Sequence, residues 1–235
     1  MRKCIIHFGM HKTGSSSIQH SFFRKLSDKD FHYIDLGYRN ASIPIATAFK
    51  KNPEKYHIHK RNATSREEVK HLRNKIFKKL KKELSRTDSR NLLLSGEDIE
   101  YLDLDEFRAL YKFINKAGLH VQAVGYVRDP KGFMESAFQQ RVKSGGLSQL
   151  NLQSLFPSYS GRFQKFETVL GRENVRYWFF EPSEFPEGCV VRDFCSRLGI
   201  KFSPDDIVRM NAGLSLPSLS LLFAYRKYGP RLNKS

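Results

Sequence analysis

A loop rich in glycine, hydroxyl and basic side chains lies near the N-terminus, where residues 7–19 read HFGMHKTGSSSIQ. Four residues separate Gly9 from Gly14, a spacing typical of loops whose backbone N–H groups bind phosphate. Loops that bind nucleoside triphosphates place a lysine directly after the second glycine, where it reaches the terminal phosphates. Here Ser15 takes that position, and the lysine, Lys12, comes before Gly14. The displaced cation favours a shorter anion that is bound without a bridging metal ion.

The hydroxyl groups of this loop support the same prediction. Thr13, Ser15, Ser16 and Ser17 can donate to an anion, together with the N–H groups that follow Gly14 where a helix is expected to begin. The alternative is an ordinary turn between a strand and a helix, with a serine cap. The clustering of glycines, a lysine and four hydroxyl side chains favours the phosphate site.

Two more polar turns follow apolar runs, SGED at residues 95–98 and RDP at residues 128–130. Arg128 can bind a phosphate through two N–H groups, although an ion pair with Asp129 would also explain it. Glu97 is a candidate general base, and its alternative role is to cap the next helix.

Short apolar runs alternate with helical periodicity along the chain. We expect strands near residues 3–8, 33–36, 91–95, 120–127 and 175–180, and helices after residue 15 and near residues 65–84, 104–116, 130–143, 163–170, 190–198 and 219–228. This alternation predicts one α/β domain over residues 1–235, with a P-loop-type, mostly parallel sheet flanked by helices on both faces. The carboxyl ends of parallel strands share one edge, so the three polar turns should meet there.

Two of these segments resemble the signatures of the sulfotransferase superfamily that uses 3′-phosphoadenosine-5′-phosphosulfate (PAPS). HKTGSSSIQ is similar to its 5′-phosphosulfate loop, above all in bacterial and carbohydrate sulfotransferases, where the loop reads like KTGTTSLQ. VGYVRDPKGFMESAF is similar to its second signature, in which Arg128 and Ser136 would bind the 3′-phosphate. The resemblance covers about residues 3–215 in layout. It implies a fold, a co-substrate and a reaction.

The resemblance also implies roles for single residues. Lys12 would stabilise the leaving phosphate, and Glu97 would take the proton of the acceptor, because carbohydrate sulfotransferases commonly use a glutamate there. His11 is the competing base, since histidine titrates near neutrality and other branches of the superfamily use histidine. Asn211 would lie near the nucleotide. His7, inside the first strand, is expected to be a satisfied core residue.

The acceptor is harder to predict than the donor. A segment of the pattern RxGxxGxWK, which small-molecule sulfotransferases use to cover the nucleotide, is missing from this sequence. Its absence favours a saccharide acceptor over phenols or steroids. The basic helix near residues 65–84 could bind an anionic polysaccharide, although charged helix faces are usually only solvated.

The charge balance widens the choice of function. The chain carries 41 Lys and Arg against 24 Asp and Glu, a formal net charge of +17. Such a field attracts nucleic acids, anionic membranes, glycans and phosphorylated cofactors alike. Two alternatives to a sulfotransferase therefore stay open: a P-loop kinase, which would need magnesium, and a basic polyanion-binding module without catalysis. We expect an anionic nucleotide as partner, and no nucleic acid.

Cysteine and apolar patterning bear on the compartment. Cys4, Cys189 and Cys195 are odd in number and lack the spacing of metal ligands, so we expect reduced core residues and no metal site. No window approaches the roughly 18 apolar residues of a membrane span, and the N-terminus lacks the pattern of a cleavable signal. These features predict a cytoplasmic protein.

Overall fold

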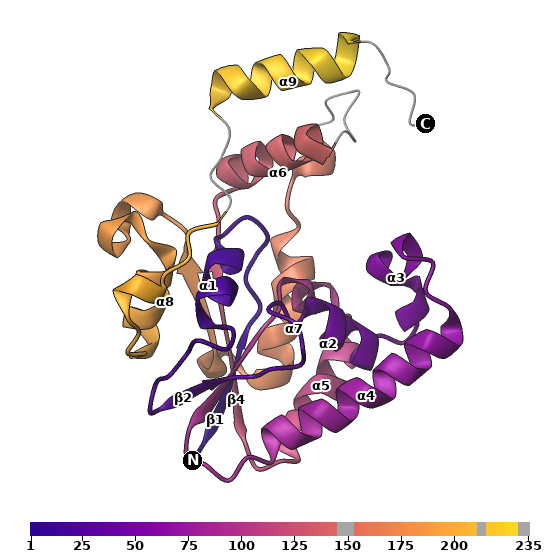
Figure 1. The fold of residues 1–235 in the computed structure, drawn as a ribbon, viewed down its shortest axis with the longest axis vertical. Helices are drawn as coiled ribbons and strands as arrows, with labels where there is room; N and C mark the ends of the chain where they lie inside the picture. The colour runs from indigo at the N-terminus through magenta and orange to yellow at the C-terminus, as the bar shows by residue number, and fades with distance from the viewer. Residues whose placement is uncertain (145–152, 211–214, 230–235) are drawn as a thin grey trace.

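The computed structural model of the chain describes residues 1–144, 153–210 and 215–229. Five parallel strands form one sheet in the order β2-β3-β1-β4-β5. Figure 1 shows this sheet, with β1, β2 and β4 labelled, among the surrounding helices. The strands are β1 (Lys3–His7), β2 (Phe31–Tyr33), β3 (Asn91–Ser95), β4 (His120–Val127) and β5 (Val175–Phe179). Because β1 pairs with both β3 and β4, the turns that follow these three strands lie side by side at one edge. The predicted parallel α/β fold is confirmed.

Alternating side chains of β1 divide the core into two layers. Cys4 and Ile6 face one cluster, whereas Ile5 faces the other. The first cluster packs against α2 (Ser42–Phe49), α4 (Arg66–Leu84), α5 (Leu104–Asn115) and α7 (Tyr159–Leu170), and the second against α1 (Ser15–Phe22) and α8 (Val190–Leu198). Burial of apolar side chains on both faces explains why the strands read as continuous apolar runs.

Helix ends follow local capping chemistry. A capping box begins α4, since the Ser65 hydroxyl accepts from the N–H of Glu68 and the Glu68 carboxylate accepts from the N–H of Ser65. A second capping box, of Asp103 and Glu106, begins α5. Asp103 therefore caps α5, and the earlier SGED turn is not its cap.

Two helices in residues 27–64 lacked a clear sequence pattern. α2 (Ser42–Phe49) contains Pro44, which looks like a helix breaker. Pro44 is the third residue of α2, where a backbone N–H would have no intrahelical acceptor in any case. The short helix α3 (His57–Arg61) follows. The strand predicted at residues 33–36 lies two residues earlier, because the Asp35 side chain accepts from the N–H of Gly37 and turns the chain there.

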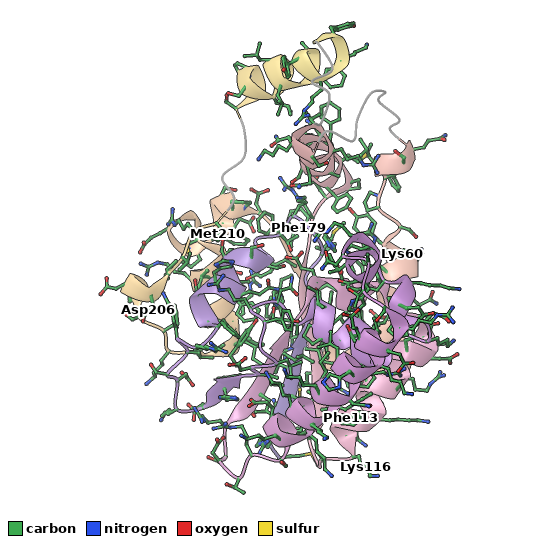
Figure 2. All side chains as sticks on the ribbon, turned by 45° about the vertical axis from the view of Figure 1, so that its right-hand side comes forward. Lys60, Phe113, Lys116, Phe179, Asp206 and Met210 are labelled. Atoms are coloured by element: carbon green, nitrogen blue, oxygen red, sulfur yellow. The ribbon has the colours of Figure 1, made fainter. Side chains whose placement is uncertain are left out.

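Two helices lie beyond the carboxyl edge of the sheet. α6 (Pro130–Ser144) extends from the end of β4, and α9 (Leu216–Tyr228) packs on it through Val142 and Leu219 (Figure 1). In Figure 2, Met210 and Phe179 lie at the end of the body from which α6 projects, and Phe113 lies at the opposite end. Within the described ranges, no helix is both long and apolar enough to cross a membrane.

Candidate active site

A cavity of about 970 Å³ opens at the carboxyl edge of the sheet. The loop after β1, the turn after β3 and the turn after β4 all contribute to its wall, so the three polar turns meet as expected. α6, the segment between β5 and α8, the first residues of α8 and residues 209–210 form the rest of the wall. Of the candidate residues from the sequence, the lining includes His11, Lys12, Gly14, Ser15, Ser16, Ser17, Glu97, Arg128 and Ser136.

The loop after β1 has the backbone conformation of an anion cradle. Lys12 and Gly14 have positive φ angles, 70° and 75°, and Gly14 is the N-cap of α1. The N–H groups of Ser15 and Ser16 have no intrahelical acceptor and no other recorded partner among the described residues. The Ser15 hydroxyl is buried and also has no hydrogen-bond partner there. An unsatisfied buried hydroxyl beside free N–H groups fits a bound anionic oxygen.

The other hydroxyl groups of the loop differ in orientation. Thr13 is fully buried, donates to the carbonyl oxygen of Met10 across 2.5 Å, and is missing from the cavity wall. Its side chain therefore stabilises the loop rather than reaching the cavity. The Ser17 hydroxyl accepts from the N–H of Met210 across 3.0 Å, which ties the segment before residue 211 to α1. Asn211 itself lies outside the described residues.

Lys12 extends from this loop toward α6. Its Nζ donates to Oε1 of Gln140 across 2.8 Å, so its charge is paired with a neutral amide and stays available for an anion. Burial lowers the pKa of Lys12, Glu97 raises it, and Lys143 lowers it further. Lys143 also lines the cavity, so two ammonium groups face the same space.

Arg128 enters the cavity from the end of β4. Its Nη1 donates to the carbonyl oxygen of Lys12 across 3.2 Å, and its guanidinium carbon lies 5.5 Å from the centre of the Phe180 ring. Asp129 forms no ion pair with it, and one carboxylate oxygen of Asp129 instead accepts from the N–H of Gly132 across 2.7 Å and caps α6. No ion pair of Arg128 occurs within residues 1–144, 153–210 and 215–229. Ser136 lies farther along α6 on the same wall.

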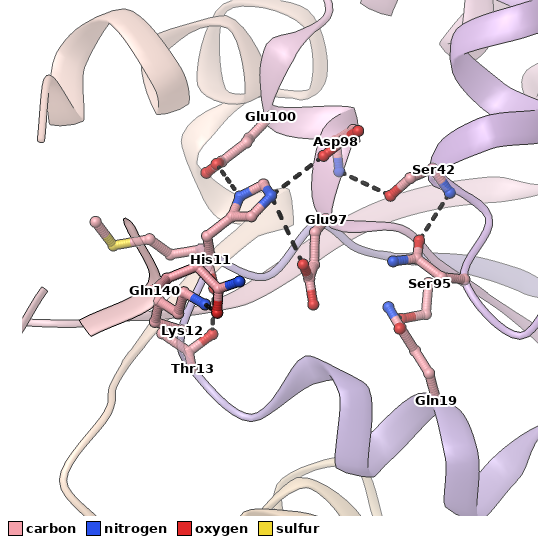
Figure 3. Close-up of polar contacts among 12 residues, drawn as sticks. His11, Lys12, Thr13, Gln19, Ser42, Ser95, Glu97, Asp98, Glu100 and Gln140 are labelled. Carbon is pink, nitrogen blue, oxygen red and sulfur yellow. Dashed lines mark hydrogen bonds and ion pairs between the residues drawn. The ribbon is translucent and has the colours of Figure 1, made fainter. Parts of the chain in front are cut away.

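His11 and Glu97 belong to a compact ionised cluster (Figure 3). Nδ1 of His11 lies 2.7 Å from a carboxylate oxygen of Glu100, and Nε2 lies 3.2 Å from Asp98 and 3.7 Å from Glu97. Arg162 also pairs with Glu100, across 3.2 Å. The imidazole is thus held between three carboxylates.

The surroundings of this cluster raise the pKa values of both His11 and Glu97. Burial alone would lower the pKa of His11, but hydrogen bonds to Asp98 and Glu100 and the nearby Glu97 charge outweigh it and raise the pKa to about 10. Burial raises the pKa of Glu97, while the charge of His11 opposes that rise. His11 is therefore an imidazolium at neutral pH, with both nitrogens protonated. Within the described part of the chain, the Glu97 carboxylate accepts no side-chain hydrogen bond and lies 3.7 Å from Nε2 of His11.

Comparison with proteins of known structure identifies the fold. A sulfotransferase from Alicyclobacillus acidocaldarius superimposes with a TM-score of 0.50 at 16% identity, over 96% of this chain and 93% of the other. The sulfotransferase domain from the curacin biosynthetic pathway gives a TM-score of 0.51 at 14% identity, over 91% and 81% of the two chains. The chain has the sulfotransferase fold.

Sequence comparison alone is less informative for this sulfotransferase-fold chain. No protein-family model matches the sequence. An uncharacterized protein of Archaeoglobus fulgidus is 26% identical over 145 residues, which is 61% of this chain and 40% of the relative. The match thus spans well under half of the relative's length.

Several residues of the site gave no readable sequence signal. Asp98 and Glu100 clamp His11, yet in the sequence they read only as acidic neighbours of Glu97. Gly132 matters because an added Cβ there would lie 2.8 Å from Nε of Arg128. The spacing of Gly132 from the RDP turn could have drawn attention to it, whereas the contribution of Phe180 depends on how β5 is placed beside β4.

His7 is another buried polar side chain near the site. His7 was expected to be satisfied, and its Nδ1 does bond to the Ser95 hydroxyl across 2.8 Å. Its Nε2 is buried without a partner among the described residues, so the expectation is met for one nitrogen only. Burial lowers the pKa of His7 to about 3, so this ring is neutral. All three cysteines are free thiols.

Proposed function

We propose that the protein transfers a sulfuryl group from 3′-phosphoadenosine-5′-phosphosulfate to a hydroxyl group, and that the acceptor is a saccharide. The observation that carries this proposal is the junction of Lys12 and Arg128 at one cavity, where the Arg128 guanidinium touches the backbone of Lys12. A nucleotide with phosphate groups at both its 5′ and 3′ positions can contact both cations there. A ligand with one phosphate chain would use only the loop.

The residues of the cavity divide between the two ends of such a nucleotide. The N–H groups of Ser15 and Ser16 and the Ser15 hydroxyl would bind the 5′-phosphate, beside Lys12. Arg128 and Ser136 would bind the 3′-phosphate, the guanidinium through two N–H groups. The base would contact apolar side chains of the cavity wall: Phe180, which lies beside Arg128, together with Phe185, Val190 and Val191.

The transfer itself needs a proton acceptor and a stabilised leaving group. The donor supplies sulfur bonded to a phosphate oxygen; that bond breaks, a bond from sulfur to the acceptor oxygen forms, and the acceptor proton must leave. Glu97 takes that proton, because its carboxylate lines the cavity and burial raises its pKa. Lys12 stabilises the negative charge that develops on the phosphate. His11 holds the acidic cluster in place, since an imidazolium has no lone pair to accept a proton.

Polar side chains support a saccharide as the acceptor. The α6 wall of the cavity presents Gln139, Gln140 and Lys143, which can donate and accept hydrogen bonds with hydroxyl groups. The cover segment typical of small-molecule sulfotransferases is also missing from the sequence.

Ligand-dependent thermal stability tests the proposal against its alternatives. 3′-Phosphoadenosine-5′-phosphate should raise the melting temperature of the full chain without magnesium, because a ligand that binds the folded state stabilises it. Stabilisation by magnesium-ATP alone would favour a kinase and overturn the proposal. If Lys12→Ala binds the nucleotide as well as the wild type, and every polyanion binds with steep salt dependence, the chain is a basic binding module instead.

A further inference from the structure

A second cavity, of about 530 Å³, lies beside the acidic cluster. Residues from the end of α1, the loop before α2, the start of α3 and the turn after β3 line it. Glu97 lines the first cavity and the next residue, Asp98, lines the second. We propose that the second cavity binds a carboxylate- or sulfate-bearing part of a saccharide acceptor, while the hydroxyl that receives the sulfuryl group lies in the first cavity. This inference rests on the proposed function.

The charges around the cavity select an anion. Arg39 lines it, is exposed, and forms no ion pair within the described part of the chain. Burial lowers the pKa of His20, and the positive charge of the nearby Arg39 lowers it further. Lys79 of α4 reaches the same rim, since a Cβ added to Gly37 would lie 2.9 Å from its Nζ. The nearby Asp35 pairs with Arg24 across 2.8 Å. The lowered pKa of His20 keeps its ring neutral, so Arg39 and Lys79 supply the positive potential of this rim.

Asp98 is the only carboxylate among the described residues that line this cavity, and it already has partners within the protein. Asp98 is 7% exposed, pairs with His11 across 3.2 Å, and accepts a short hydrogen bond from the hydroxyl of Tyr56. The negative charge of Asp98 is therefore already balanced by the imidazolium of His11. The unpaired guanidinium of Arg39 remains to attract a ligand anion from outside, and its planar fork matches a carboxylate or a sulfate.

Aromatic side chains of the cavity supply the apolar contacts of the proposed saccharide site. Tyr38 is 38% exposed on the cavity wall, and the ring of Tyr56 lies 4.4 Å from that of His57. Apolar ring faces with polar edges suit the C–H faces and hydroxyl groups of a pyranose. The Tyr56 hydroxyl is fixed on Asp98, so this wall is ordered before any ligand arrives.

Consecutive residues of one short, well-bonded segment line the two cavities. Glu97 and Asp98 are consecutive residues of the 3₁₀ helix Glu97–Tyr101, and the N–H of Asp98 donates to the Ser42 hydroxyl across 2.9 Å. Ser42 also lines the second cavity. A saccharide anchored on Arg39 is thus held against the element that carries the proposed base. The acceptor would then be positioned by contacts separate from those that bind the nucleotide.

Calorimetry on the full chain, saturated with 3′-phosphoadenosine-5′-phosphate, tests this inference. The probes are a tetrasaccharide of alternating glucuronic acid and N-acetylglucosamine, its 6-O-sulfated form, and the same tetrasaccharide with its carboxylates reduced to alcohols. At least one anionic probe should bind and the reduced one should bind at least about tenfold more weakly, as expected for loss of a charge-assisted hydrogen bond. Arg39→Ala should cause a similar loss for the anionic probe. Tyr38→Ala should also weaken its binding.

Arg61→Ala is the matched control, because Arg61 is exposed on α3 and does not line the cavity. It removes the same charge and should leave saccharide affinity unchanged. Equal losses in Arg39→Ala and Arg61→Ala, equal binding of charged and reduced probes, or no binding of any probe would overturn the inference. Nucleotide affinity should be unaffected in all three variants. If the wild type fails to bind the nucleotide, the proposed function fails, whatever the saccharides do.

Discussion

The guanidinium of Arg128 donates a hydrogen bond to the backbone carbonyl of Lys12, with 3.2 Å between Nη1 and the oxygen. This contact joins the end of β4 to the loop after β1, two elements more than a hundred residues apart in sequence. It also sets two cations at one cavity while leaving both side chains without a carboxylate partner in the described residues. Gly132 permits this placement, because it has no Cβ to meet Nε of Arg128.

Replacement of Lys12 tests the charge at the leaving group. Lys12→Ala should lower kcat by a factor on the order of 10²–10³, since it removes a cation aimed at developing negative charge. The melting temperature should change little, because within the described ranges the ammonium group makes one hydrogen bond, to Gln140, and no ion pair. Lys131→Ala removes an 87% exposed lysine from α6 and serves as the control. Turnover near the wild-type value in Lys12→Ala would remove this residue from the mechanism.

The role of Arg128 can be separated from that of the loop by a comparison of two ligands. Arg128→Ala should weaken binding of 3′-phosphoadenosine-5′-phosphate by about tenfold to a hundredfold, the usual effect of losing a charge-assisted pair. Affinity for AMP, which lacks the 3′-phosphate, should stay nearly constant. Arg128→Lys should recover part of the loss, because it keeps the charge but not the fork. Equal losses for both ligands in calorimetry would contradict the assignment of Arg128 to the 3′-phosphate.

The sequence was most informative where local chemistry determines structure. The capping box at Ser65, the apolar runs of the strands and the glycine loop before α1 all depend on neighbours within a few residues. The alternation of strands and helices predicts parallel strands, whose carboxyl ends lie at one edge of the sheet. Lys12, Glu97 and Arg128 each follow one of these strands and therefore line the same cavity.

What the sequence did not reveal depends on contacts between distant segments. Asp98 and Glu100 act on His11 only because the turn after β3 lies beside the loop after β1. The same approach makes His11 an imidazolium, which its ordinary titration range does not predict. Thr13 looked like a ligand by composition, but its hydroxyl turns inward to Met10. Such orientations are settled by packing and not by residue type.

The clamp on His11 should appear as a pH-dependent contribution to stability. Its folded-state pKa, about 10, is raised above the ordinary 6.5, so the stabilisation is fully present below about pH 6.5 and is lost as pH rises through about 10. The difference in melting temperature between wild type and His11→Gln should therefore shrink between these pH values. His71→Gln, on the exposed face of α4, is the control. A difference that stays constant or grows with pH would contradict the clamp.

Glu97 is expected to govern the acid limb of activity. Glu97→Gln should abolish transfer and leave nucleotide binding intact, because the amide keeps the shape of the side chain but cannot take a proton. In the wild type, kcat/KM should fall with decreasing pH at a value above the ordinary 4.5 of a glutamate, since burial raises the pKa of Glu97 and only the ionised form is a base. His11 opposes that rise, so His11→Gln should move the acid limb to higher pH while retaining activity. If Glu97→Gln remains active while His11→Gln is inactive across the pH range, His11 is the base and this assignment is wrong.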